Sequence, residues 1–250
     1  MTLTMMFTGA SSASAQDAEA PLFGGNVQFM TNYVAIGLSQ SVGQPGVEAE
    51  LDYNLGDGWY GGLSGNNTNW VSQLYPGSNV SLELNGWAGY RLHFAGDWSW
   101  KAGVLRLQFP GDYARQTPPV AEPNSTEAYG YLSWRRLSAK LSWMITDSFG
   151  KADSRGSWYL DLGASQPLGS HWKTAEHLGR KHDAGTNPVT GLRNDRADFT
   201  DYKLAITYNF AEDISLTLAH TWTNGNPAIF TLNGYDLGGH HTWMLLEKDF

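Results

Sequence analysis

The chain has 250 residues, of which 41% are hydrophobic, and a formal net charge of −8. The hydrophobic share is too high for a disordered chain, and the acidic balance argues against a nucleic-acid partner. The absence of cysteine excludes disulfides, thiolate metal sites and cysteine nucleophiles. The 29 glycines, 11 Trp and 12 Tyr favour strands and turns over helices. No apolar run reaches the length of about 18 residues that predicts a transmembrane helix.

The first residues have features of a secretory signal. Residues 3–7 form a short apolar run, and Ala13-Ser14-Ala15 fits the small-x-small cleavage rule. We therefore expect residues 1–15 to be the remnant of a signal peptide, with a flexible tail as the alternative. Residues 16–25 are then a periplasmic N-terminal tail, and residues 26–250 form the folded domain.

Most of the remaining chain alternates between apolar and polar residues with the period of two typical of β-strands. In the clearest example, Tyr202, Leu204 and Ile206 share one face, opposite Lys203 and Ala205. In chain order we predict strands over residues 26–35, 47–55, 59–65, 81–92, 97–107, 127–134, 137–143, 158–165, 172–180, 202–210, 214–223 and 240–250. These are about twelve strands of roughly nine to eleven residues, and 172–180 is the least regular.

The connections between these strands alternate strictly between long and short. Gly56–Gly58, Phe94–Asp97 and Arg135–Arg136 are short, and long segments such as 109–125 separate them. A soluble sandwich has no reason to sort its loops in this way. A transmembrane barrel does, because its periplasmic turns are short and its extracellular loops are long. An even number of strands also places both ends of the barrel domain in the periplasm.

Tyrosine and tryptophan cluster near the predicted strand ends, where aromatic girdles lie in membrane barrels. The residues predicted at the membrane interface are Trp98, Trp100, Trp158, Tyr208, Trp222 and Phe250. Ordinary core aromatics are the alternative, but the opposite face carries Ser, Thr, Asn, Glu and Lys throughout, which suits a watery lumen. We therefore predict an all-β fold, a single antiparallel transmembrane β-barrel of about 12 strands whose apolar face meets lipid.

Inward-facing charges define the predicted pore. Glu48, Glu50, Asp52 and Glu83 fall on one arc, and the other predicted pore-lining residues are Arg91, Lys140, Asp161 and Lys203. Rings or facing arcs of charge set selectivity in barrel channels, so the acidic arc predicts a narrow pore with a weak cation preference. The alternative is that these charges pair and plug the lumen, as in small closed barrels.

No catalytic constellation is visible. Ser148 and Lys151 have the Ser-x-x-Lys spacing of penicillin-recognising enzymes, but they fall in a predicted loop and the partner motifs are missing. None of the seven histidines stands two residues before a serine, the spacing that would place both on one face of a strand. His220 lies on the apolar face of its strand, where an interfacial role is the simplest interpretation. We expect no enzymatic activity.

No metal site or cofactor is indicated either. His240 and His241 are adjacent in a strand and therefore point to opposite faces. Asp195, Asp198 and Asp201 would bind Ca²⁺ only loosely, because arginines interrupt them. A solvated loop is the expected state of this segment.

A group of residues within positions 24–70 matches a known family, namely Asn26, Val27, Tyr33, Val34, Gly37, Ser39, Gln40, Ser41, Asp52, Tyr53, Trp59, Tyr60 and Gly61. This segment, about a fifth of the chain, resembles the proteobacterial TorF family of porin-like proteins. Family members carry an Arg just before the Gly-x-Ser-Gln-Ser glycine, where this chain has Ile36, and often an aromatic residue in place of Ala35. The resemblance implies a bacterial outer-membrane barrel and a passive channel, but no particular solute.

Together these observations predict an outer-membrane porin of a Gram-negative bacterium that lets ions or small polar solutes diffuse passively. The expected partners are outer-membrane lipid and lipopolysaccharide, the solutes themselves, and the barrel-assembly machinery, because a terminal Phe such as Phe250 resembles the signal that this machinery recognises. One alternative is a closed barrel with a structural, adhesive or loop-binding role. Another is a secreted, Trp-rich β-sandwich that binds carbohydrate.

Overall fold

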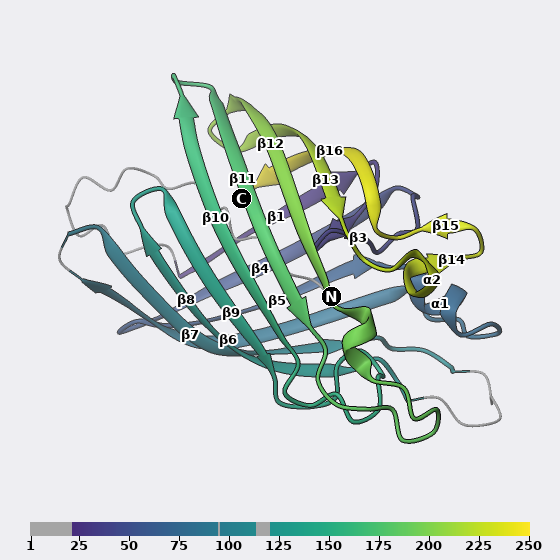
Figure 1. The fold of residues 1–250 in the computed structure, drawn as a ribbon. Coiled ribbons are helices and arrows are strands. Elements are labelled where there is room, and N and C mark those ends of the chain that lie inside the picture. The colour runs from purple at the N-terminus through teal and green to yellow at the C-terminus, as the bar shows by residue number, and fades with distance from the viewer. Residues whose placement is uncertain (1–21, 95, 114–120) are drawn as a thin grey trace.

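Long antiparallel strands close into a barrel in the computed structural model, which describes residues 22–94, 96–113 and 121–250 (Figure 1). Each barrel strand pairs with its neighbours in the chain, and β1 pairs with both β4 and β16. The last pairing closes the ring, so no strand edge of the described barrel is left open. The predicted twelve-strand antiparallel barrel is confirmed.

The barrel strands are β1 (Phe23–Met30), β4 (Gly46–Gly56), β5 (Trp59–Asn67), β6 (Leu82–Phe94), β7 (Trp98–Gln108), β8 (Ser125–Trp134), β9 (Leu137–Met144), β10 (Trp158–Leu168), β11 (Trp172–His182), β12 (Phe199–Ala211), β13 (Ile214–Thr223) and β16 (Gly239–Asp249). β1 begins at Phe23, inside the segment expected to be a tail, because its first residues pair with β4. The expected signal remnant lies outside the described residues. The least regular predicted strand is complete as β11, since it pairs along its whole length with β10.

The two ends of the barrel differ. At one end, tight turns such as Gly56–Asp57–Gly58 join the strands, with positive φ angles of 81°, 49° and 86° that favour glycine. We call this the short-turn end and the opposite one the long-loop end. The long loops hold short elements, gathered at one side in Figure 1: β2 (Val34–Ala35), β3 (Leu38–Ser39), α1 (Trp70–Leu74), η1 (Asn194–Ala197), α2 (Pro227–Phe230), β14 (Thr231–Leu232) and β15 (Tyr235–Asp236). Among the described residues, no helix is long and apolar enough to cross a bilayer.

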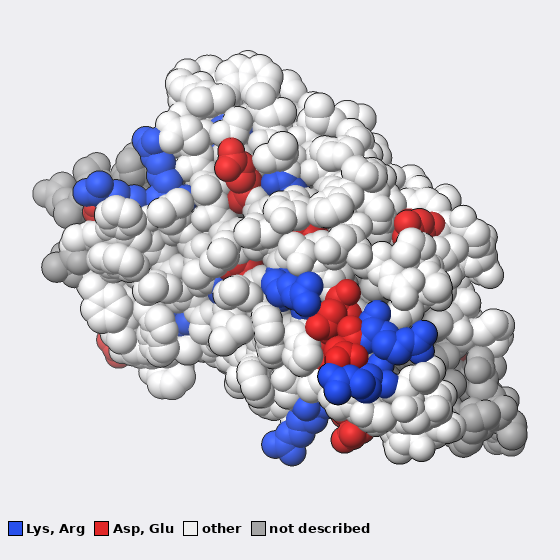
Figure 2. Space-filling view, viewed as in Figure 1, with Lys and Arg blue, Asp and Glu red and all other residues white. Residues whose placement is uncertain are grey.

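The outward face of the barrel is apolar. Leu204 and Leu63 are 64% and 58% exposed, and alternate residues of the other strands behave in the same way. Figure 2 shows that one face of the molecule carries few charged side chains and that these gather in a small number of places. Such a surface suits contact with lipid, because large exposed apolar surfaces are rare on soluble monomers.

The inward face is not polar throughout, and this corrects the sequence-based expectation. Leu105, Leu107 and Met144 of β7 and β9 point inward and are 7%, 0% and 1% exposed. Tyr159 and Phe199 do the same on β10 and β12. All five lie toward the long-loop end, where loops fold across the mouth of the barrel and need apolar partners.

Candidate functional site: the lumen and its mouth

The acidic arc lies on the inward face but is enclosed. Glu48, Glu50 and Asp52 alternate along β4 with outward-facing residues, and Glu83 lies on β6. Glu48, Glu50 and Glu83 are only 2%, 1% and 0% exposed. The structure therefore brings the predicted carboxylates to the lumen side of the wall, yet it shields three of them from open water.

The remaining predicted pore charges point inward, and several are paired. Lys140 Nζ lies 3.6 Å from Glu127 Oε1, and Asp161 Oδ1 lies 2.9 Å from His177 Nδ1. The guanidinium of Arg91 stands 5.6 Å from the centre of the Tyr60 ring. Lys203 lies on β12, within the electrostatic reach of Asp161 and Asp201. This pairing has the form of the alternative in which lumen charges neutralise one another.

A buried network on β10, β11 and β12 was missed by the sequence reasoning. His177 Nε2 lies 2.7 Å from Asp201 Oδ2, and the Tyr159 hydroxyl donates to Asp201 Oδ1 at 2.9 Å. With Asp161 on its other nitrogen, His177 bridges two carboxylates. The sequence does contain a sign of this network, because the alternation along β11 places His177 on the same face as Lys173 and Lys181. The mixed polarity of the outward residues Glu176 and Arg180 concealed it.

Two apolar clusters cover the mouth. The first mouth cluster consists of Ile36, Val42, Tyr159, Ala197, Phe199, Phe230 and Leu237. The second mouth cluster consists of Val71, Tyr75, Val80, Leu105, Leu107 and Phe109. Trp70 and Phe149 pack against both clusters, and the Trp70 ring lies edge-on to Phe109 at 5.5 Å. Side chains from several loops thus form a continuous apolar layer at the long-loop end.

The first long loop carries the residues of the family-like motif and is held at the mouth by hydrogen bonds. Ser39 and Ser41 are fully buried. The Ser39 backbone N–H donates to Leu237 O at 2.7 Å, and its hydroxyl donates to Asn32 Oδ1 at 2.6 Å. A Cβ at Gly37 would lie 2.3 Å from Thr223 Oγ1, so only glycine allows this close approach to β13.

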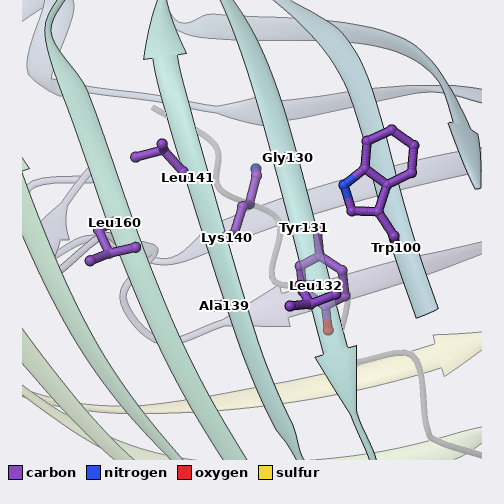
Figure 3. A pocket seen from close by; sticks show the side chains of 8 residues that line it. All are labelled: Trp100, Gly130, Tyr131, Leu132, Ala139, Lys140, Leu141 and Leu160. Atoms are coloured by element: carbon purple, nitrogen blue, oxygen red, sulfur yellow. The ribbon is translucent and has the colours of Figure 1, made fainter. Parts of the chain in front are cut away.

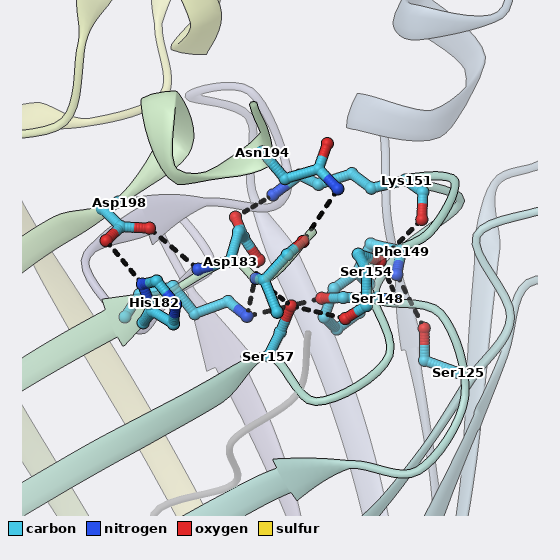
Figure 4. Close-up of polar contacts among 12 residues, drawn as sticks. Ser125, Ser148, Phe149, Lys151, Ser154, Ser157, His182, Asp183, Asn194 and Asp198 are labelled. Atoms are coloured by element: carbon cyan, nitrogen blue, oxygen red, sulfur yellow. Dashed lines mark hydrogen bonds and ion pairs between the residues drawn. The ribbon is translucent and has the colours of Figure 1, made fainter. Parts of the chain in front are cut away.

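A second polar network fixes the loops between β9 and β10 and between β11 and β12 (Figure 4). The buried Asp183 carboxylate accepts from Lys151 Nζ and, at 2.9 Å, pairs with Lys181 Nζ. Burial would raise the pKa of Asp183, but the two ammonium groups outweigh it and hold this pKa below its ordinary range. Ser148 accepts a hydrogen bond from Lys181 at 3.4 Å, so the Ser-x-x-Lys residues take part in loop packing.

The candidate calcium and histidine groups do not converge. Asp195 pairs with Arg193, Asp198 lies 2.8 Å from His182, and Asp201 points into the barrel. His241 lies 2.9 Å from Leu237 O inside the mouth, whereas the His240 ring lies 6.2 Å from Trp222 on the outer face. The described residues contain no cluster of three or more metal-ligating side chains.

The predicted interface aromatics lie on the outer wall, toward its two ends. At the short-turn end, Trp98 stacks on Trp134 at 5.7 Å and Tyr208 lies 4.7 Å from Trp172. Phe250 lies 6.2 Å from Phe23 at the same end. At the long-loop end, Trp158 is the first residue of β10 and Trp222 is the last but one of β13. Their contact with the membrane interface stays a prediction.

Trp100 borders a shallow depression of about 260 Å³ (Figure 3). Outward-facing Leu132, Leu141 and Leu160 line it, together with Gly130. A Cβ added at Gly130 would meet no atom within 4 Å, so this depression opens outward. It belongs to the outer wall and not to the lumen.

The fold places the protein in the class of barrels to which outer-membrane porins belong. The NanC porin aligns with a TM-score of 0.56 and 12% identity over 90% of this chain and 98% of its own. The KdgM porin aligns with a TM-score of 0.54 and 8% identity over 91% of this chain and 98% of its own. The COG4313 outer membrane channel from Pseudomonas putida F1 aligns with a TM-score of 0.53 and 15% identity over 92% of this chain and 97% of its own. At these identities the similarity shows the fold alone.

Residues 14–250 match the family described as "Bacterial protein of unknown function (Gcw_chp)". The match spans nearly the whole chain, so the chain belongs to this family. A comparison with curated proteins finds no match.

Proposed function

We propose that this protein is an outer-membrane channel for the passive diffusion of ions or small polar solutes. The observation that carries the proposal is the closed barrel with an apolar outer belt and a row of charged and polar side chains inside. A closed barrel can carry such a lumen across lipid, because all backbone groups of its strands are paired within the wall. The fold shared with the KdgM and NanC porins supports the proposal.

The proposal has finer parts. The TorF resemblance of residues 24–70 suggests that this family of unknown function includes TorF-like proteins. Outer-membrane lipid and lipopolysaccharide would contact the outer belt, and Phe250, which lies beside Phe23 where β1 meets β16, would contact the barrel-assembly machinery. A weak cation preference would come from the acidic arc of Glu48, Glu50, Asp52 and Glu83.

Single-channel recording tests the channel. The protein is refolded into a planar bilayer under a KCl gradient, and its insertion is checked by the heat-dependent gel shift of intact barrels. Discrete current steps are expected, and the sign of the reversal potential reports the ion preference. An inserted, heat-modifiable protein without current would overturn the channel.

A closed barrel with a loop-binding role is the second candidate. The two mouth clusters favour it, because buried apolar side chains from several loops cover the long-loop end. In that case the loops, and not the lumen, are the functional surface. The same recording separates the two candidates.

A further inference from the structure

Two tyrosines lie flat against the inner wall and meet over a pair of glycines. Tyr60 on β5 is in register with Gly89 on β6, which is in register with Gly103 on β7 and then with Tyr129 on β8. The two hydroxyl oxygens are 2.7 Å apart. A Cβ at Gly89 would lie 2.6 Å from the Tyr60 hydroxyl, and one at Gly103 would lie 2.7 Å from the Tyr129 hydroxyl. The glycines therefore make room for an aromatic shelf.

A row of cations runs beside this shelf, in the next inward row of the same strands. Arg91 on β6 stands directly opposite Lys101 on β7, which is opposite Tyr131 on β8 and then Lys140 on β9. The Lys101 ammonium lies 5.8 Å from the Tyr60 ring centre and 5.7 Å from that of Tyr131. The Lys140 ammonium lies 4.8 Å from that of Tyr129. We call these six residues, Tyr60, Tyr129, Tyr131, Arg91, Lys101 and Lys140, the tyrosine–cation strip.

The pairing of Arg91 with Lys101 is unfavourable for the fold. Like charges directly opposite on one face of a sheet are destabilising. Arg91 repels the Lys101 ammonium while Asp52 on β4 attracts it, and Arg91 makes no ion pair with another described residue. Lys140 has its own carboxylate, Glu127. Arg91 is therefore the cation of this row that can pair with an anion in the lumen.

We propose that the tyrosine–cation strip binds a ring-bearing carboxylate, such as a sugar acid, as it passes through the lumen. The Arg91 guanidinium can hold a carboxylate in a bidentate pair. The tyrosine rings offer a flat surface for the ring face of the solute, and the hydroxyls of Tyr60 and Tyr129 offer hydrogen bonds to its hydroxyl groups. The inference rests on the proposed channel, because the solute must enter the lumen.

Melting of the detergent-refolded barrel tests binding without requiring a current. The melting temperature is followed by the heat-dependent gel shift with glucuronate, with acyclic gluconate and with neutral glucose. Glucuronate is expected to raise it most, gluconate less and glucose not at all. In Arg91→Gln the apparent affinity for glucuronate falls about tenfold, as expected for loss of a charged hydrogen-bond pair. This variant removes a like-charge contact, so it is expected to fold.

Lys173→Gln is the matched control, because Lys173 is another inward lysine on β11 and lies outside the strip. It should keep the response to glucuronate, whereas Tyr131→Leu should reduce the difference between glucuronate and gluconate. Equal stabilisation by glucuronate and glucose would overturn the inference. Equal losses of apparent affinity for glucuronate in Arg91→Gln and Lys173→Gln would also overturn it.

Bilayer recording separates this inference from the proposed channel. Glucuronate is expected to reduce the KCl current at millimolar concentration, and Arg91→Gln to relieve that block. A KCl current that glucuronate and glucose affect equally leaves the channel standing and overturns the strip. A glucuronate-dependent shift in melting without any KCl current supports binding at the strip but overturns the channel, and with it passage of the solute.

Discussion

The two halves of the barrel interior are built from different chemistry. At the long-loop end, Trp70 and Phe149 join two clusters of buried apolar side chains. Farther along the lumen, Arg91, Lys101 and Lys140 stand over tyrosine rings. In the proposed channel, loop packing would control whether a solute enters, and the charges on the wall would control which solute passes.

The largest effect on channel opening is expected from loosening the mouth. Trp70→Ala removes the side chain that links the two mouth clusters, a loss of about 2 kcal/mol for a partly buried tryptophan. If the packed loops oppose an open state, the ratio of closed to open channels falls roughly thirtyfold. The open probability in single-channel recordings measures this change. Trp98→Ala on the outer wall is the control, and an unchanged open probability in Trp70→Ala would separate the mouth clusters from gating.

The polar network at the mouth gives the largest effect on the free energy of unfolding. Asp183→Asn leaves the ammonium group of Lys181, 3% exposed, without its carboxylate partner. Removing one member of a buried ion pair costs about 3 kcal/mol. The urea midpoint of the heat-dependent gel shift should fall accordingly. The exposed pair of Asp195 and Arg193 supplies the control, since Asp195→Asn should leave the midpoint nearly unchanged.

The Asp183 carboxylate also makes the stability of the folded barrel depend on pH. Because the pKa of Asp183 is lowered in the folded barrel, its stabilising effect is fully present above the ordinary carboxyl range. It is lost as pH falls through the folded pKa, below about pH 4. The wild-type midpoint should therefore drop in this window more than that of Asp183→Asn. If the urea midpoints of the wild type and of Asp183→Asn fell by the same amount over this pH range, the stabilising role of the Asp183 carboxylate would be contradicted.

A smaller effect distinguishes the two faces of the wall. Gly103→Ala places a Cβ 2.5 Å from Ala88 O and against the Tyr129 hydroxyl, which should cost about 1–2 kcal/mol. Gly130→Ala on the neighbouring strand meets open space and should change stability by less than about 0.5 kcal/mol. Urea titrations of the two variants measure the difference. Equal midpoints would mean that the tyrosine shelf can move aside.

The smallest effect is expected from the acidic arc, because it is enclosed. Replacing Glu48, Glu50 and Asp52 by Gln, Gln and Asn should move the reversal potential under a KCl gradient toward that of an anion-preferring pore. The shift should be modest, since Glu48 and Glu50 are only 2% and 1% exposed. An unchanged potential would remove the acidic arc from the selectivity of the channel.

The barrel wall follows from local pattern, and the mouth does not. Alternation along residues such as Tyr202 to Phe210 predicts strands because each side chain has only two faces to choose from. Loop packing depends on contacts between distant segments, such as Ser39 with Leu237, which no local period encodes. Leu105 and Leu107 lie on the inward parity of β7, so their apolar character signals an inward contact, but not with which loop.

The tyrosine–cation strip can be predicted from the sequence only in part. The parity of β7 places Lys101 on the inward face opposite Trp98 and Trp100, so its direction follows from sequence. Whether Arg91 faces Lys101 depends on the register of β6 with β7. The sequence pattern therefore supplies the inward residues one strand at a time, while the charges that face each other emerge only once the strands are paired.

The ring is closed by strands from opposite ends of the folded domain. Gln28 on β1 donates to Glu247 on β16 at 2.8 Å, a contact between residues 219 positions apart. Until β16 arrives, β1 and β13 each present an unpaired edge that can join the wrong strand or another chain. Contacts of such long separation form slowly. We therefore expect closure to be a late step of folding, and the growing sheet must be kept from aggregation until β1 and β16 pair.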